Sequence, residues 1–438
     1  MKFIEVEYKM LLEDGKIDNS LYDKYDVKRG LRNSNGTGVL VGLTKVSDVH
    51  GYKLIDGKKC DDEGHLYYRD IDLYDLANKD EDVYGYEKTV FLLLFGHLPS
   101  KYEFEEFLEM LKDNLELPSG FVETVIFKNP AKNLMNSLQR SILSLYSFDD
   151  DPDTQDPMKL IVKGISLIAK MPAIIAYSYQ AKHHFIDNES LHIHYVNKSK
   201  SLAEQILYLV RDDCQYSELE AETLDTALIV HADHGGGNNS TFSNVVVSST
   251  GTDLYSSISA GLGSLKGPRH GGANQMVMEM FDAILAEIGE NATDEEIEKV
   301  VNKILKKDFF DNSGLIYGIG HAVYTISDPR CILLKEKCKA LCEEKGRSKL
   351  FDFYARFEEI ACRRLKEVKG NVYCANVDFY SGLTYSMLNI PRDLFTPIFA
   401  TARITGWIAH IIEAILYCNK IIRPASLYVG HIKEEKKD

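Results

Sequence analysis

The 438-residue chain is 45% hydrophobic and 27% charged, a balance typical of a folded globular protein and not of a disordered one. Its formal net charge of -15 at pH 7 disfavours nucleic acid and anionic membrane surfaces as partners. A small anionic substrate remains compatible with this charge, because it responds to the few cations that line its site.

The N-terminal segment from Met1 to Gly15 is acidic and lacks the basic flank and apolar run of a signal peptide. The eight cysteines show neither C-x-x-C spacing nor a small disulfide framework. We therefore expect a cytoplasmic protein with reduced thiols and no targeting segment.

Two segments carry a capping box, which marks the start of many helices. In the first, Ser100 and Glu103 precede apolar residues at helical spacing, and this pattern ends before residue 118. In the second, Thr293 and Glu296 precede apolar residues at i, i+3, i+4 and i+7. Both segments are predicted to be amphipathic helices.

The longest apolar stretch runs from Pro397 to Cys418, but Arg403, His410 and Glu413 interrupt it. A membrane span needs about 20 mostly apolar residues, so a core helix is the better interpretation. A buried arginine in such a helix is costly unless it is paired, and we therefore expect an anionic partner for Arg403.

Strand patterns are few, and the alternation at 244–249 is too short to organise a sheet. No repeat of a strand followed by a helix is found. The predicted fold class is therefore mainly α. Loops at 149–157 and 289–293 are candidate domain boundaries.

Four short segments combine Gly, His, Arg and Asp in ways that core packing does not require. They lie at 231–239, 267–274, 318–330 and 376–382, and Arg403 and Arg423 follow them.

Two histidines in these segments, His270 and His321, are framed by glycines, which permit tight turns and close backbone approach to a ligand. One such histidine is equally compatible with a loop residue that bonds a backbone carbonyl. Two of them, together with the Asp-Pro-Arg at 328–330 and Asp378, favour a functional site.

This set of motifs, in this order, resembles the citrate synthase family over most of the chain. Gly318 to Arg330 reads G-x-G-H-x-V-x(4)-D-P-R, Gly267 to Asn274 reads G-P-x-H-G-x-A-N, and Leu92 to Pro99 reads LLLFGHLP. The resemblance implies a multi-helical fold with a large and a small domain around an active-site cleft, which closes after oxaloacetate binds.

The resemblance also implies the domain limits. An N-terminal segment would span 1–30, and the large domain would consist of 31–270 and 380–438. The small domain would span 271–379, and the C-terminal part of the large domain would reach the partner subunit.

The reaction implied by the resemblance is the condensation of acetyl-CoA with oxaloacetate and water to give citrate and CoA, without a cofactor or a metal. Asp378 is implied as the base that removes a proton from the methyl group of acetyl-CoA. His270 would donate a hydrogen bond to the thioester oxygen, and His321 would do so to the keto oxygen of oxaloacetate.

Oxaloacetate itself would be held by His234, Arg330, Arg403 and Arg423, three of which carry the guanidinium fork that suits carboxylates. In the family the arginine that matches Arg423 comes from the other subunit. The resemblance therefore implies an obligate homodimer.

Coenzyme A would contact the backbone of the segment that precedes His321, at Leu315, Ile316, Gly318 and Gly320. Here the sequence departs from the family pattern. Thr325 stands where many members carry an arginine or lysine that contacts the phosphates of coenzyme A, and Ile319 replaces a commoner aromatic residue.

The closest alternative activity is that of 2-methylcitrate synthase, which uses propionyl-CoA with the same residues. One methylene discriminates by only about 10 to 200-fold, so the sequence leaves the acyl chain open, and we expect acetyl-CoA to be preferred.

Alternatives from other classes rest on weaker patterns. A metallohydrolase could be built on His231, Asp233 and His234, with His192 and His194 as a second cluster. We prefer a structural role for His231 behind His234, and solvated surface positions for His183, His184, His192 and His194.

Two further alternatives are a dinucleotide site and a non-enzymatic scaffold. The glycines at 261–267 are spaced one residue too widely for a dinucleotide-binding loop and follow no convincing strand. A non-enzymatic helical scaffold would have no use for glycine-framed histidines or for arginines in apolar helices.

Overall fold

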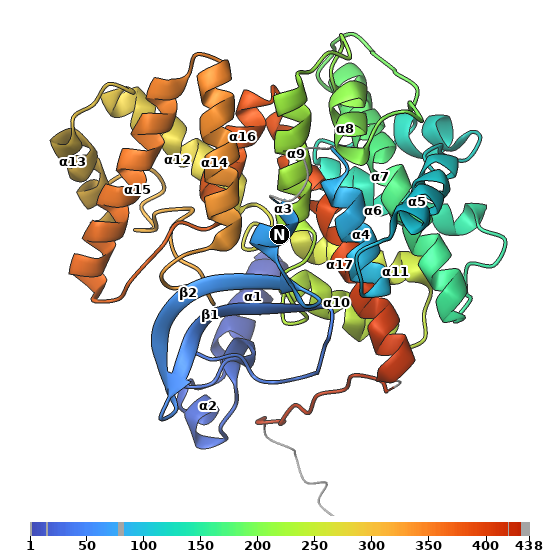
Figure 1. Ribbon diagram of the computed structural model, residues 1–438. Helices are drawn as coiled ribbons and strands as arrows, with labels where there is room; N and C mark the ends of the chain where they lie inside the picture. Colours follow the sequence, from blue (N-terminus) through green and yellow to red (C-terminus); the bar gives the residue numbers. More distant parts are fainter. Residues whose placement is uncertain (1, 15, 78–82, 419, 431–438) are drawn as a thin grey trace, which may run out of the picture.

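The computed structural model describes residues 2–14, 16–77, 83–418 and 420–430 (Figure 1). Its helices are α1 (Lys2–Asp14), α2 (Ser20–Lys24), α3 (Leu73–Ala77), α4 (Gly85–Phe95), α5 (Lys101–Asp113), α6 (Leu134–Ser144), α7 (Pro157–Phe185), α8 (Leu202–Val210), α9 (Glu218–His231), α10 (Asn239–Ser248), α11 (Leu254–Leu265), α12 (Ala273–Ile288), α13 (Asp294–Leu305), α14 (Pro329–Glu344), α15 (Ser348–Lys369), α16 (Val377–Met387) and α17 (Phe395–Tyr417). The strands are β1 (Ser47–Ile55), β2 (Lys58–Tyr68) and β3 (Ile71–Asp72). The prediction of a mainly α fold is confirmed.

Both predicted capping boxes are present. Ser100 and Glu103 exchange side-chain and backbone hydrogen bonds at the start of α5, and Thr293 and Glu296 do the same at the start of α13. Each box satisfies backbone N–H groups that the first helical turn leaves without a partner.

Helix α17 is the predicted core helix. It packs against α4, α7, α9 and α10. By length and composition alone, α7 and the segment 392–417 are each apolar enough to cross a membrane. However, 72% and 78% of their apolar windows are buried inside the protein, so other helices cover the surface that lipid would contact. These two helices form the centre of the hydrophobic core.

The interpretation of 244–249 as a strand pattern is wrong, because α10 runs through Ser248. Asn244 is fully buried there, and its Oδ1 accepts a hydrogen bond from the backbone N–H of Gly261 on α11. The helices α10 and α11 therefore pack closely at Asn244 and Gly261.

Sequence patterns did not reveal the antiparallel sheet β1-β2-β3. Its alternation is interrupted by an irregularity between His50 and Tyr52. The sheet lies against the loop at 322–328: a Cβ on Gly51 would stand 2.7 Å from Cα of Tyr324, and one on Gly64 would stand 2.1 Å from the carbonyl oxygen of Ser327. Glycine at both positions therefore lets the sheet position this loop.

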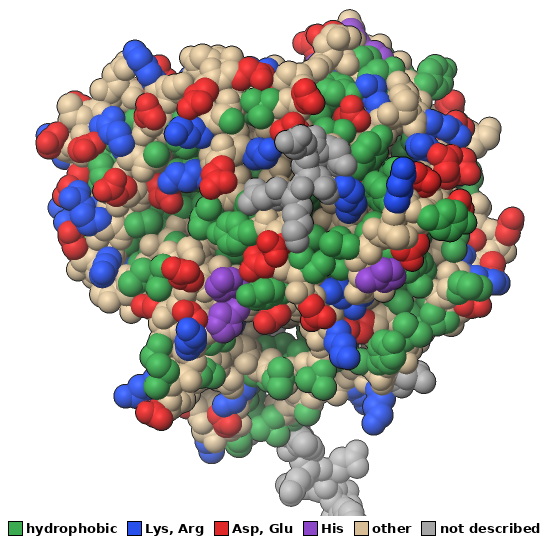
Figure 2. All heavy atoms as spheres, viewed as in Figure 1, with side chains coloured by type: hydrophobic (Ala, Val, Ile, Leu, Met, Phe, Trp, Pro, Cys, Tyr) green, Lys and Arg blue, Asp and Glu red, His purple; other side chains and the backbone are tan. Residues whose placement is uncertain are grey.

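Helices α12 to α15 lie together on one side of the molecule in Figure 1, and most of the other helices lie on the opposite side. Helix α14 packs against both α9 and α16, and α12 packs against α16. On the face drawn in Figure 2, acidic and basic side chains are interspersed over both groups. Two of the arginines singled out in the sequence, Arg330 and Arg403, are instead buried.

Candidate active site

Arg403 is a buried cation whose hydrogen-bonding capacity is mostly unused. Its side chain on α17 is fully buried, its Nε donates to the carbonyl of His231 at 2.7 Å, and its guanidinium lies 4.7 Å from the ring centroid of Phe399. Neither terminal amino group has a hydrogen-bond partner among the described residues. Burial lowers the pKa of Arg403 to about 10. The predicted anionic partner is thus not a hydrogen-bonded side chain of the described part of the chain, and the two amino groups are free for a ligand.

Arg330 is held by its neighbour in the Asp-Pro-Arg segment. Its Nε and Nη2 donate to the two carboxylate oxygens of Asp328 at 3.0 and 2.8 Å. Asp328 also accepts from the backbone N–H of Arg330, as the N-cap of α14, and from that of Val377 at 3.1 Å. Since Val377 begins α16, one carboxylate ties Arg330 to the helix that carries Asp378.

His234 and His321 meet edge to face, with ring centroids 5.2 Å apart, and Tyr324 flanks both rings. The Nδ1 of His321 accepts backbone hydrogen bonds from Val323 and Tyr324 at 3.0 and 3.2 Å, so the ring proton resides on Nε2. Burial, followed by the charge of Arg330, lowers the pKa of His321 to about 4 and that of His234 well below its usual range. Both rings are therefore neutral at physiological pH, and Nε2 of His234 is buried with no protein partner among the described residues.

The loop that leads to His321 is fastened to the start of α16. Gly318 and Gly320 have φ angles of 82° and 96°, and a Cβ on Gly318 would lie 3.0 Å from Cα of Phe379. Asn376 donates its backbone N–H to the carbonyl of Gly318 and its side-chain amide to that of Gly320, both at 2.8 Å. The same side chain caps α16 by accepting from the N–H of Asp378. Only glycine fits this close approach without strain.

Asp378 stands in the first turn of α16. Burial raises its pKa to about 6, and the charge of Arg330 partly offsets this effect. A carboxylate with a pKa near neutrality is a stronger base than an exposed one and is still largely ionised at physiological pH.

His270 lies in the turn between α11 and α12, with its Nε2 3.0 Å from Oγ of Ser240. The same hydroxyl accepts from the indole N–H of Trp407 at 3.2 Å and lies 2.8 Å from Oδ1 of Asn238. Burial, followed by the charge of Arg403, lowers the pKa of His270 to about 4. Sequence reasoning did not identify Ser240, although it follows the glycine-rich segment after His234 directly.

The structure brings six of the predicted site residues into one region. Their charges act on one another: the charges of Arg330 and Arg403 both lower the pKa values of Asp378 and His234. The six residues are His234, His270, His321, Arg330, Asp378 and Arg403.

The other predicted residues, Arg423 and the coenzyme A contacts, do not belong to this group of six. Arg423 is exposed, in the irregular segment that follows α17. Of the predicted coenzyme A contacts, Leu315 is 52% exposed and Ile316 is buried. The loop that contains Gly318 and Gly320 thus runs from the surface to His321.

The metallohydrolase alternative is wrong. Among the described residues, no group of three or more His, Cys, Asp or Glu side chains is placed to hold a metal ion. His231 donates from Nδ1 to the carbonyl of Ala227 at 2.7 Å and packs edge to face on Phe399, which matches the structural role preferred for it.

The structure agrees with the rejection of a dinucleotide site, because the glycines at 261–267 lie in and just after α11, which follows the helix α10 and not a strand. One other expectation needs correction. The four histidines expected to be solvated are half-buried, because their rings pack on neighbouring aromatic rings or approach an acidic side chain; they are His183, His184, His192 and His194.

Comparison with known proteins agrees with this fold. The family model described as "Citrate synthase, C-terminal domain" matches residues 33–425. The chain therefore belongs to the citrate synthase family, whose enzymes are acyltransferases.

Similar curated proteins include enzymes named citrate synthase and enzymes named 2-methylcitrate synthase. The chain is 36% identical over 411 residues to citrate synthase from Haloferax volcanii, an alignment that covers 92% of this chain and 96% of the relative. It is 31% identical over 372 residues to 2-methylcitrate synthase from Shewanella oneidensis, with 83% and 88% covered.

Two solved structures share the fold. Citrate synthase from Thermotoga maritima matches with a TM-score of 0.73 at 32% identity, over 93% of this chain and 97% of that one. Citrate synthase from Thermoplasma acidophilum, solved as a ternary complex with carboxymethyl coenzyme A and oxaloacetate, matches with a TM-score of 0.76 at 25% identity over the same shares.

Proposed function

We propose that this protein is a citrate synthase of the tricarboxylic acid cycle, which condenses acetyl-CoA with oxaloacetate and water to give citrate and CoA. One observation carries the proposal: Arg403 is fully buried, two of its amino groups are unbonded among the described residues, and neutral His234 and His321 share its region. The relatives named citrate synthase and the ternary complex of the Thermoplasma enzyme support the same reaction.

Oxaloacetate is a dianion, and two buried guanidinium groups match its charge. Arg403 offers both amino groups, and Arg330 retains Nη1, because its Nε and Nη2 are bound to Asp328. His234 adds Nε2, whose lack of a protein partner leaves it for a ligand atom. Charge-assisted hydrogen bonds of this kind are about twice as strong as neutral ones.

The condensation needs a base and two donors. The carboxylate of Asp378 takes a proton from the methyl group of acetyl-CoA, while His270 hydrogen-bonds the thioester oxygen on which negative charge develops. The new carbon nucleophile attacks the keto carbon of oxaloacetate, and Nε2–H of His321 supplies the proton to the resulting alkoxide. Water then cleaves the citryl thioester, which releases citrate and CoA.

Coenzyme A is assigned to the loop that leads to His321, through the backbone of Leu315, Ile316, Gly318 and Gly320. Thr325 makes no contribution to this binding, because its hydroxyl donates to the carbonyl of Gly51 at 2.7 Å and accepts from the N–H of Asp62. Main-chain groups and cations elsewhere then have to bind the phosphates.

We assign 271–379 to a small domain that closes on the large one, made of 31–270 and 380–438. His270, the proposed donor, and Asp378, the proposed base, lie at the two ends of this segment. Rotation of the small domain would therefore change the distances from these two residues to the substrate. Closure after oxaloacetate binds would exclude water until the carbon bond has formed.

We further propose a homodimer in which Arg423 completes the partner's oxaloacetate site. Arg423 is exposed on its own chain, and apolar side chains near it, Ile421 and Tyr428, are 62% and 69% exposed. Phe3 and Ile4 on α1 are likewise 70% and 66% exposed. A second copy of the chain would cover such side chains.

The reducing cytoplasm is the compartment that we assign to the enzyme. All eight cysteines lie within the described residues and are free thiols. Disulfides are rare in that compartment.

A thiol-release assay on the purified protein tests the activity and the acyl chain together. Acetyl-CoA and propionyl-CoA are each supplied with and without oxaloacetate. We expect oxaloacetate-dependent release from both, with the higher kcat/KM for acetyl-CoA. A higher kcat/KM for propionyl-CoA would reassign the enzyme as a 2-methylcitrate synthase, and no release from either would refute the condensation.

A further inference from the structure

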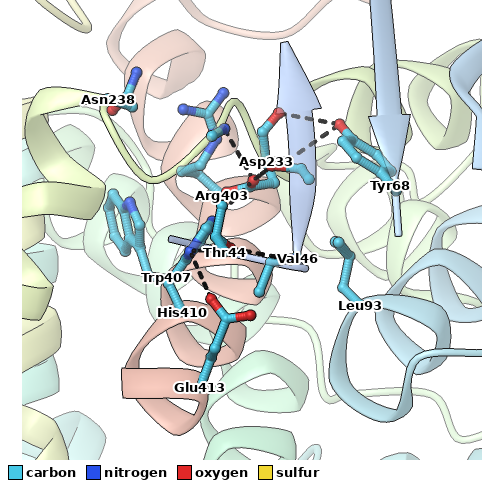
Figure 3. Close-up of polar contacts among 12 residues, drawn as sticks. Thr44, Val46, Tyr68, Leu93, Asp233, Asn238, Arg403, Trp407, His410 and Glu413 are labelled. Carbon is cyan, nitrogen blue, oxygen red and sulfur yellow. Dashed lines mark hydrogen bonds and ion pairs between the residues drawn. The ribbon is translucent and has the colours of Figure 1, made fainter. Parts of the chain in front are cut away.

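Asp233, the residue before His234, carries a fully buried carboxylate that accepts three hydrogen bonds, none of them from an arginine. Its Oδ2 accepts hydrogen bonds from the hydroxyl of Ser47, from the N–H of Gly235 at 3.0 Å and from Nε2 of His410 at 3.2 Å. Figure 3 shows Asp233 beside α17, close to Arg403 and His410. Burial in an apolar fold would raise the pKa of this carboxyl, but His410 and the neighbouring charges hold it well below its usual range.

Asp233 and Arg403 are neighbours of opposite charge that do not hydrogen-bond. The carboxylate contributes to keeping Arg403 protonated against the effect of burial. Yet its Oδ1 and both amino groups of Arg403 lack hydrogen-bond partners among the described residues. A Cβ on Gly406, three residues after Arg403, would lie 2.2 Å from this Oδ1, so the carboxylate is wedged against the helix backbone.

The two side-chain donors to Asp233 come from segments that are tied to each other. The backbone N–H of Lys45 donates to the carboxylate of Glu413 at 2.7 Å, and the hydroxyl of Thr44 lies 3.4 Å from Nδ1 of His410. The chain at 44–47 is thereby fixed to α17, the helix that carries both His410 and Arg403. The donors therefore cannot move independently of Arg403.

We propose that His410 and Ser47 are positioning residues for the substrate site. Their hydrogen bonds hold the carboxylate of Asp233 near Arg403, as a counter-charge, but away from hydrogen-bonding contact with it. The two amino groups of Arg403 therefore stay free for a substrate carboxylate. The inference rests on the proposed oxaloacetate site. Without these two donors only the N–H of Gly235 holds Oδ2, and the carboxylate can turn toward Arg403. The buried ion pair formed in this way would compete with the substrate for the same two amino groups.

The test compares two substitutions at one position. His410→Gln keeps an amide N–H close to the place of Nε2, whereas His410→Leu keeps the size and removes the donor. With acetyl-CoA saturating, we expect His410→Leu to raise the KM for oxaloacetate by about 10-fold or more, the effect of one hydrogen bond to a charged group. Its kcat and its KM for acetyl-CoA should change by less than about 3-fold, and His410→Gln should restore the KM for oxaloacetate to within about 3-fold of wild type.

A second variant covers the case in which His410→Leu does not fold. Ser47→Ala removes the hydroxyl donor and leaves His410 in place, and it should raise the same KM. Ser243→Ala is the matched control, because its hydroxyl bonds only the carbonyl of Asn239 in its own helix among the described residues. Thermal unfolding of each variant separates loss of fold from loss of affinity.

Calorimetric titration with oxaloacetate alone distinguishes failure of this assignment from failure of the proposed function. If the wild type turns over normally but His410→Leu and Ser47→Ala bind oxaloacetate as tightly as it does, the positioning assignment is overturned alone. Equal losses in His410→Leu and His410→Gln would also overturn it, since the donor would then be irrelevant. A wild type that neither binds oxaloacetate nor forms citrate would overturn both.

Discussion

The rings of His234 and His321 stand edge to face, 5.2 Å between centroids, and both are neutral inside the fold. Two imidazolium ions at this distance would repel each other and the nearby Arg330. Because the rings stay neutral, the positive charge of the site comes from arginines alone, and each ring has one nitrogen that donates a hydrogen bond and one that accepts. The assignment of oxaloacetate binding to the arginines and of proton supply to His321 depends on this division.

Replacing the proposed base tests the first chemical step. Asp378→Asn keeps the size of the side chain and its place in the first turn of α16, but an amide cannot take a methyl proton. We expect kcat to fall by about 100-fold or more, while oxaloacetate affinity measured by calorimetry stays within about 3-fold of wild type. A kcat close to that of wild type would remove Asp378 from the mechanism.

Arg403→Leu should separate affinity from stability. The leucine removes a guanidinium group whose two terminal amino groups can both donate to oxaloacetate. Its loss should weaken oxaloacetate binding by about 100-fold. In the absence of substrate, the free energy of unfolding of the leucine variant should differ from that of wild type by less than about 1 kcal/mol. Removal of a buried cation with two unbonded amino groups is favourable, but the buried carboxylate of Asp233 loses a counter-charge. Calorimetric binding and urea unfolding measure the two effects. Unchanged affinity would contradict the arginine clamp, and a large loss of stability would show that the cation is structural.

Mixing two inactive variants tests whether Arg423 acts across a dimer interface. Arg423→Ala and Asp378→Asn subunits are refolded together in equal amounts. A hybrid dimer has one intact site, formed by Asp378 of one chain and Arg423 of the other, so the mixture should regain about a quarter of wild-type activity. The unmixed variants, refolded in the same way, are the controls. If the mixture is no more active than they are, Arg423 does not act in trans.

Glu87 should make the free energy of unfolding depend on pH. Burial and the neighbouring Asp225 raise the pKa of this α4 carboxyl to about 8. Above about pH 4.5 the unfolded chain releases the proton while the folded chain retains it, so the free energy of unfolding should fall as the pH rises from about 5 to 8. Glu87→Gln removes this contribution, and its stability relative to wild type should rise by about 3.5 kcal/mol between these pH values.

Urea unfolding at pH 5 and pH 8 checks this prediction, with Glu106→Gln, an exposed position on α5, as the control. The control should show the same difference from wild type at both pH values. A Glu87→Gln variant that behaves like the control would contradict the raised pKa.

Local sequence patterns predicted the helix starts, which depend on hydrogen bonds between residues close together in the sequence. The capping boxes at Ser100 and Thr293 were identified from four residues each, because their bonds join positions three apart. The sheet was not predicted, since Gly51 and Gly64 serve a contact with a loop more than 250 residues away, and the bulge beside Gly51 breaks the alternation of β1.

The site shows the same limit. The predicted residues were recognised from motifs, but the bonds that position them join distant segments, such as Ser240 to His270 and Ser47 to Asp233. Neither Ser240 on a helix nor Ser47 on a strand has a sequence signature for such a role. The expectation of an anionic partner for Arg403 follows from the cost of burying charge. The absence of a hydrogen-bonded side chain at its two amino groups, among the described residues, depends on the fold and has no sequence signature.

Stoichiometric product analysis measures whether the buried arginines, the histidines and Asp378 form one site for a dicarboxylate and an acyl thioester. The purified protein is incubated with acetyl-CoA and oxaloacetate, and free CoA and citrate are quantified together. We expect equal amounts of the two products and none of either when oxaloacetate is omitted. CoA released without oxaloacetate, or without matching citrate, would contradict this assignment.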